Sequence, residues 1–174
     1  MTSISEATKS GVIARAGLWS VLAFVLSLTW EIAHVRLYTL WEAADHMTIT
    51  WSVLHCSLGD VVIALSFFAL AGFALRQKDW PVLRPIAGSA IVVIGALAFT
   101  VWSEWFNVYK IGSWGYTSRM PVIFGIGLSP LLQWLLLPPL MTIAYRALWP
   151  RLFDRCSSSA SIPLCILRRS ENER

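Results

Sequence analysis

The chain alternates between long apolar stretches and short polar segments, and this pattern predicts its helices. Four stretches can each supply the roughly 20 helical residues that a hydrocarbon core of ~30 Å requires. They cover, in chain order, about residues 17–38, 51–75, 85–109 and 121–138. Strands are not expected, because the stretches are long and lack a period of two. The pattern therefore predicts an all-α integral membrane four-helix bundle over residues 17–149.

The fourth stretch is interrupted by prolines. It stays apolar over residues 121–149, which would exceed the membrane as one straight helix at ~1.5 Å per residue. Pro130 lacks a backbone N–H, so we expect a kink there. We expect the pair Pro138-Pro139 to end or bend the helix, and the residues after it to leave along the membrane interface.

Composition agrees with a membrane protein. The 174 residues are 56% hydrophobic and only 14% charged, well below the roughly 25% of an ordinary soluble domain. Tryptophan is enriched where membrane meets water, and the chain has ten of them. The net charge of +4 belongs to loops and tails, where topology and anionic lipid account for it. We expect the lipid bilayer as partner, with a second copy or a membrane complex as further candidates, and no nucleic acid.

Lysine and arginine set the orientation, because cytoplasmic loops carry an excess of them. They occur before the first stretch, in the 76–84 loop and after residue 145, whereas the 39–50 loop has none. We therefore expect both termini in the cytoplasm. We further expect the membrane to be the inner membrane of a bacterium. Residues 1–16 are predicted to form a cytoplasmic tail. Residues 150–174, which are Ser-rich and then charged, are predicted to form a disordered one.

Five acidic and histidine residues interrupt the apolar stretches in the half that is predicted to face outward. At ~1.5 Å per residue from the nearest interfacial tryptophan, Glu31 and Glu104 lie about 15 Å deep and Asp60 about 13 Å. His34 and His55 lie nearer the surface by the same measure. Glu31 and His34 share a helix face at a spacing of three. We expect all five side chains to line one polar pocket that opens toward the outside.

Further polar residues are expected to support this pocket. On the fourth stretch Gly125, Ser129 and Gln133 recur every four residues and form a small, polar face, which favours close helix packing. The supporting candidates are Tyr38, Asn107, Tyr116, Arg119 and Gln133.

Three kinds of function fit such a pocket. The Glu31-x-x-His34 spacing occurs in carboxylate-bridged metal sites, and with His55, Asp60 and Glu104 it could form a mixed N/O site for a transition metal. Alternatively Glu104 and Glu31 are the catalytic acids of a membrane enzyme on a lipophilic, isoprenoid-like substrate, because a carboxylic acid in an apolar pocket can keep its proton near neutral pH. In the third interpretation the polar groups bond to one another and fix the helices of a structural subunit.

The segments WEIAHVRLY, HCSLGD, SEWFNVYKIGSWGY and MPVIFGIGLSPLLQW resemble a family of small bacterial four-span membrane proteins. The resemblance extends over about residues 17–140 and implies a four-span fold, but no known activity. The segment GSWGYTSRMP is also loosely similar to bacterial membrane-bound carotenoid cyclases and hydratases, although the paired acids beside a proline are absent. No nucleotide-binding motif is present, so no nucleotide cofactor is expected.

Overall fold

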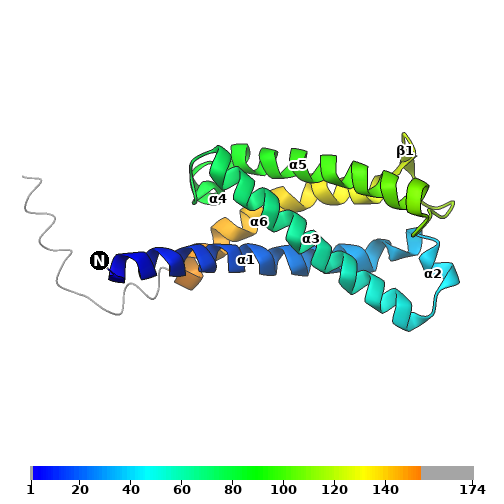
Figure 1. The fold of residues 1–174 in the computed structure, drawn as a ribbon, viewed down its shortest axis with the longest axis horizontal. Coiled ribbons are helices and arrows are strands. Elements are labelled where there is room, and N and C mark those ends of the chain that lie inside the picture. Colours follow the sequence, from blue (N-terminus) through cyan, green and yellow to red (C-terminus); the bar gives the residue numbers. More distant parts are fainter. Residues whose placement is uncertain (1, 154–174) are drawn as a thin grey trace, which may run out of the picture.

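Four long helices form an antiparallel bundle in the computed structural model, which describes residues 2–153 (Figure 1). The helices are α1 (Thr2–His34), α3 (His46–Ala74), α5 (Pro85–Trp105) and α6 (Leu128–Phe153). Each contains a segment long and apolar enough to cross a membrane. The chain is therefore a multi-pass, mostly helical membrane protein, as its hydrophobic pattern predicts.

Short elements connect the long helices at the two ends of the bundle. Figure 1 places the beginning of α1, the connection through α4 and the end of α6 at one end, and α2 and β1 at the other. In chain order the short elements are the 3-10 turn η1 (Val35–Leu37), α2 (Leu40–Ala43), α4 (Trp80–Leu83), the π-helical turn η2 (Phe106–Ile111), β1 (Val122–Ile123) and β2 (Ile126–Gly127). The two strands pair as an antiparallel hairpin.

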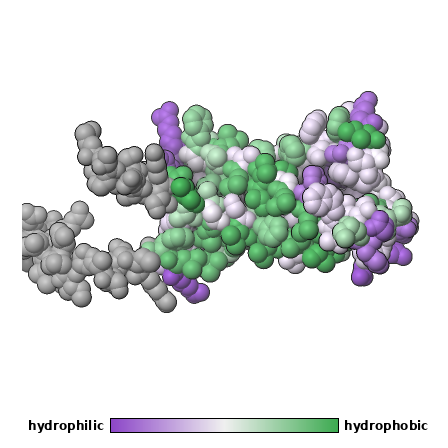
Figure 2. All heavy atoms as spheres, turned by 60° about the horizontal axis from the view of Figure 1, so that its bottom comes forward, coloured by the Kyte–Doolittle hydropathy of each residue, from purple (hydrophilic) through white to green (hydrophobic). Residues whose placement is uncertain are grey.

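The surface of the bundle suits a membrane. On the face in Figure 2, hydrophobic side chains cover the middle of the molecule and hydrophilic ones gather at its ends. Val21, Val62 and Ile94 are among the large hydrophobic residues that are more than half exposed. In a bilayer these side chains contact lipid, which removes the cost of their exposure.

Two buried tryptophans pack against each other at the end of the bundle that carries α4. Trp19 and Trp80 are both 0% exposed, and their ring centroids are 5.3 Å apart. Each indole Nε1 donates to a backbone carbonyl of α3, that of Ala64 and that of Phe68 respectively, at 3.1 Å. Because α5 approaches Trp80 closely, a Cβ on Gly88 would lie 1.8 Å from its ring.

The first two spans begin earlier than predicted. α1 is already helical from Thr2, so the predicted tail 1–16 is mostly part of this helix. α3 begins at His46 because Asp45 caps it. The Oδ1 atom of Asp45 accepts hydrogen bonds from the backbone N–H groups of Met47 at 2.8 Å and Thr48 at 3.0 Å. These bonds, that from Thr48 above all, hold the pKa of Asp45 below its usual value.

The fourth span differs from its prediction at both ends. Residues 121–127 contain the hairpin, and α6 then runs from Leu128 through Pro138 and Pro139 to Phe153. Pro130 falls in the first turn of α6, where a backbone N–H has no partner within the helix, so it breaks no helical hydrogen bond. Membrane helices tolerate internal prolines where neighbouring groups form hydrogen bonds with the backbone groups that the proline leaves without a partner. Of the predicted tail 150–174, residues 150–153 belong to α6 and the others lie outside the described residues.

Candidate ligand cavity

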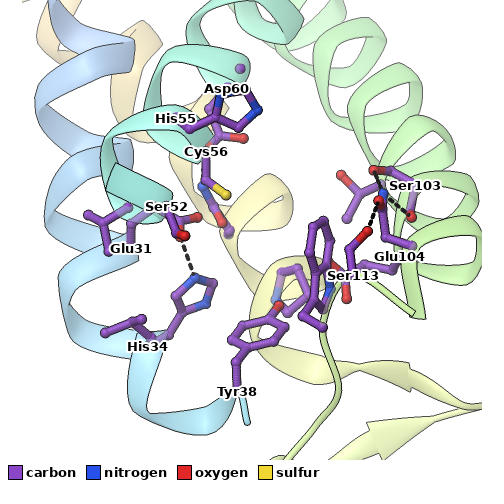
Figure 3. A pocket seen from close by; sticks show the side chains of 18 of the residues that line it. Glu31, His34, Tyr38, Ser52, His55, Cys56, Asp60, Ser103, Glu104 and Ser113 are labelled. Carbon is purple, nitrogen blue, oxygen red and sulfur yellow. Dashed lines mark hydrogen bonds and ion pairs between the residues drawn. The ribbon is translucent and has the colours of Figure 1, made fainter. Parts of the chain in front are cut away.

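A cavity of about 690 Å³ lies between the four long helices, near the end of the bundle that carries α2 and the hairpin. Figure 3 shows polar side chains pointing into it from several helices. The structure places all five predicted ionisable residues in its wall: Glu31, His34, His55, Asp60 and Glu104. Apolar residues such as Val62, Phe99 and Trp134 complete the lining.

His34 links α1 to α6 through a chain of three polar groups. Its Nε2 lies 3.0 Å from Oε2 of Glu31, one turn earlier on the same helix. Its Nδ1 lies 2.8 Å from Oγ of Ser129, in the first turn of α6. With its proton on Nε2, the imidazole donates to the carboxylate and accepts from the hydroxyl. The result is a continuous carboxylate–imidazole–hydroxyl chain between two helices.

Asp60 and Gln133 form a second polar pair, which links α3 to α6. Nε2 of Gln133 donates to Oδ2 of Asp60 at 2.6 Å, and both residues are buried. Gln133 lies one turn after Ser129, so a single face of α6 supplies partners to both α1 and α3. This agrees with the predicted polar face, except that Gly125 lies outside α6, in the hairpin turn with φ +83°.

Glu104 is the third carboxyl group in the wall of the cavity, and its partner comes from a loop. The side chain is 7% exposed on α5, and the Tyr116 hydroxyl donates to its Oε2 at 2.6 Å. Burial and this hydrogen bond raise the pKa of Tyr116, so the phenol remains a donor at neutral pH.

The Tyr116 loop is itself fixed to the loop that follows α1. Tyr38 and Tyr116 form an isolated antiparallel bridge, with ring centroids 5.7 Å apart. On either side of it, Thr39 N–H donates to the Gly115 carbonyl and Thr117 N–H to the Leu37 carbonyl, both at 2.9 Å. These bonds position Tyr116 over Glu104 from a loop that would otherwise be free to move.

The remaining predicted residues differ in their relation to the cavity. His55 is exposed at its margin on α3. Tyr38 and Asn107 line the cavity, and the Asn107 side chain bonds to Ser103 and Ser113 (Figure 3). Arg119 is exposed and is not part of the lining, so the structure gives it no contact with the cavity.

Each carboxyl group of the cavity has a different hydrogen-bond or ion-pair partner. Glu31 bonds to His34, Asp60 to Gln133 and Glu104 to Tyr116. Within residues 2–153, no three His, Cys, Asp or Glu side chains lie close enough together to hold a metal ion. The metal site therefore stays a prediction, and the described residues offer it no assembled set of ligands.

Sequence reasoning predicted two features of the site only in part. Ser129 was expected to offer hydrogen bonds from a small, polar helix face, but its partner, His34, was not predicted. Trp114 was expected among the interfacial tryptophans and, in the enzyme interpretation, near Glu104, and it lines the cavity. No spacing rule identifies either role, because both depend on which helices and loops are neighbours.

Comparison of the chain with protein-family profiles, curated proteins and solved structures found no match. The resemblance to small bacterial four-span membrane proteins accordingly stays a prediction. The function has to be argued from the cavity itself.

Proposed function

We propose that this membrane protein binds a small lipophilic molecule that carries a hydrogen-bonding group. The observation that supports the proposal is the cavity of about 690 Å³, whose lining combines apolar side chains with three carboxyl groups, two of them buried. Ligand pockets in proteins usually measure ~300–1,000 Å³ and combine an apolar lining with a few polar groups in fixed positions. In this cavity Glu104 and the Glu31–His34 pair would hold the polar group, and Phe99 and Trp134 would contact the apolar part.

We further propose that the cavity lies in the outer half of a bacterial inner membrane. The end of the bundle that carries α4 is the more basic one, and basic segments remain in the cytoplasm. Its lysines and arginines are Arg15, Arg76, Lys78, Arg84, Arg146 and Arg151. A reporter fused after Lys78 should be active only in the cytoplasm. Periplasmic activity of this fusion would reverse the orientation.

A second candidate function is acid–base chemistry on the bound molecule. Two features favour it: the short hydrogen bond between Tyr116 and Glu104, and the chain from Glu31 through His34 to Ser129. A positioned acid can protonate a double bond, and aromatic walls can stabilise the resulting cation. The reaction classes are cyclisation, hydration and isomerisation of an isoprenoid-like substrate. Glu104 would be the acid, because its carboxyl group is buried and its position is fixed by Tyr116.

Other polar groups of the cavity have a more structural role. Asp60 accepts a hydrogen bond from Gln133, and the pair joins two helices in the manner of interhelical hydrogen bonds in membranes. A transition-metal site, or a place in a larger membrane complex, has no comparable support among the described contacts.

Mass spectrometry of purified protein tests the proposed binding. Organic extracts of the wild type should contain a lipophilic molecule in stoichiometric amount. Extracts of Glu104→Gln should contain much less of it. The control is Glu42→Gln, which changes an exposed carboxylate on α2 and should retain the molecule. Extracts without any such molecule would refute ligand binding, and metal analysis of the same samples tests the metal alternative.

A further inference from the structure

Helices α3 and α5 are in close contact at one level and separate at another. A Cβ on Gly95 of α5 would lie 2.2 Å from the Phe67 ring of α3, so the helices touch there. Gly59 lies two turns closer to the start of α3, and a Cβ on it would meet nothing within 4 Å. Figure 1 shows α3 diverging from α5 toward the end that carries α2. The two helices therefore leave a gap beside Gly59.

The residues along this gap face both the cavity and the exterior. On α3 they are His55, Gly59 and Val62, which share a helix face and are all exposed. On α5 they are Phe99, which is exposed, and Ser103, which is half-buried. Because all five also line the cavity, the gap is an opening of the cavity and not a separate groove.

The opening lies at a depth where lipid chains surround the protein. Gly59 is near the middle of α3, which runs from His46 to Ala74 and is longer than the hydrocarbon core is thick. Its exposed neighbour Val62 is apolar, whereas Asp60 and Glu104 point inward and are buried. A molecule at this opening is therefore dissolved in the bilayer and not in water.

We propose that the cavity takes its ligand sideways from the bilayer, through the gap between α3 and α5 beside Gly59. The ligand class that fits has a hydrocarbon portion, which passes between Val62 and Phe99, and one hydrogen-bonding end group, which reaches Glu104 and Glu31. A helix of a second copy would cover the gap but leave these carboxyl groups without a new partner. This inference rests on the proposed function, since it assumes that the cavity is a binding site.

Cys56 provides a reporter for this opening. It is half-buried, lines the cavity and lies one turn before Gly59. Replacing Cys156 and Cys165, which lie outside the described residues, with serine leaves Cys56 as the single thiol. The full-length protein in native membranes is then treated with N-phenylmaleimide, which is uncharged, or with the charged sulfonatoethyl methanethiosulfonate. Each rate is divided by that of the same reagent with a free thiol in solution.

A lateral opening predicts a clear difference between the two reagents. Because charged groups enter the membrane interior poorly, the normalised rate of the charged reagent should be lower by about tenfold or more. In Gly59→Phe the new ring occupies the gap, so labelling by N-phenylmaleimide should slow several-fold. Gly17→Phe on α1 is the matched control. A Cβ on Gly17 also meets nothing within 4 Å, but Gly17 does not line the cavity, so labelling should not change.

Two results would overturn the inference. Equal normalised rates for the two reagents would mean that the cavity opens to water. Reaction of Cys56 with neither reagent until the protein is denatured would mean that the gap is covered, for example by a second copy. A molecule found in extracts together with a water-side opening would leave the proposed function intact and refute only the lateral route.

Discussion

The two ends of the bundle bury different kinds of side chain. Near α4, the buried side chains are the aromatic rings of Trp19, Trp80 and Tyr145, which pack against one another. Near α2, the buried groups include Glu104 and His34, and they surround a cavity of about 690 Å³. A cavity reduces stability, whereas tight aromatic packing increases it. The comparison indicates that the packed end stabilises a bundle whose other end contains the cavity.

The largest expected effect on stability comes from removing an aromatic side chain at the packed end. Trp19→Ala should lower the free energy of unfolding by ~3–5 kcal/mol, because it leaves a cavity where a fully buried ring was. Trp51→Ala is the matched change at the open end. Trp51 is 68% exposed, so the loss should stay within ~0.5 kcal/mol. Denaturant titration in micelles measures both values, and equal losses would contradict the comparison.

A smaller effect is expected from adding one methyl group. Gly88→Ala places a Cβ 1.8 Å from the Trp80 ring, which is fully buried and cannot move aside without cost. Overpacking of this kind costs ~1–3 kcal/mol. Gly59→Ala adds the same methyl group beside the open gap and should leave stability unchanged. Thermal unfolding of the two variants in the same detergent gives the difference. A Gly88→Ala variant as stable as the Gly59→Ala variant would mean that both ends of the bundle tolerate an added methyl group equally well.

The polar pairs of the open end should contribute less than the aromatic packing. A double-mutant cycle with Asp60→Leu and Gln133→Leu should give a coupling free energy of ~0.6–2 kcal/mol, the range for interhelical hydrogen bonds in membranes. The double variant should lose less stability than the sum of the losses in the two single variants. The reason is that each single variant leaves one polar group buried without a partner. Strictly additive losses, measured by the same titration, would show that the pair does not hold α3 to α6.

The smallest expected effect is that of the cap on α3, at the outer margin of the open end. Hydrogen bonds lower the pKa of Asp45 in the folded protein. The cap therefore stabilises the fold above the unfolded-state pKa of about 4, and this contribution is lost as the pH falls through the lower, folded-state value. Asp45→Ala should remove this dependence together with the stabilisation. Asp45→Asn should keep a cap that does not titrate, so an Asp45-like acid response in that variant would assign the dependence to another group.

The number of spans could be predicted from the sequence, because long apolar stretches are a local signal. Their bounds could not, since they depend on local chemistry that outweighs hydropathy. Asp45 starts α3 inside a segment that the sequence suggested to be a loop, and a hairpin replaces the expected first turns of the fourth span. The internal prolines of that span, Pro138 and Pro139, do not end the helix.

The residues of the candidate site were predictable, but their partners were not. The depth in the membrane that is predicted from the sequence is similar for Glu31, Asp60 and Glu104. The structure places all three in the wall of one cavity. Which group bonds to which depends on the neighbours of each helix. The pairing of Asp60 with Gln133 and of Glu104 with Tyr116 requires contacts between segments that are 73 and 12 residues apart in the chain.

The polar face of α6 has a consequence for how the protein is made. α6 is the least hydrophobic of the four spans, and its Gln133 and Ser129 find their partners only on α3 and α1. Both partner helices precede α6 in the chain and leave the ribosome first. During biosynthesis we therefore expect α6 to insert after α1 and α3. Its polar side chains then enter the membrane at lower cost, because Asp60 and His34 are already in place as hydrogen-bond partners.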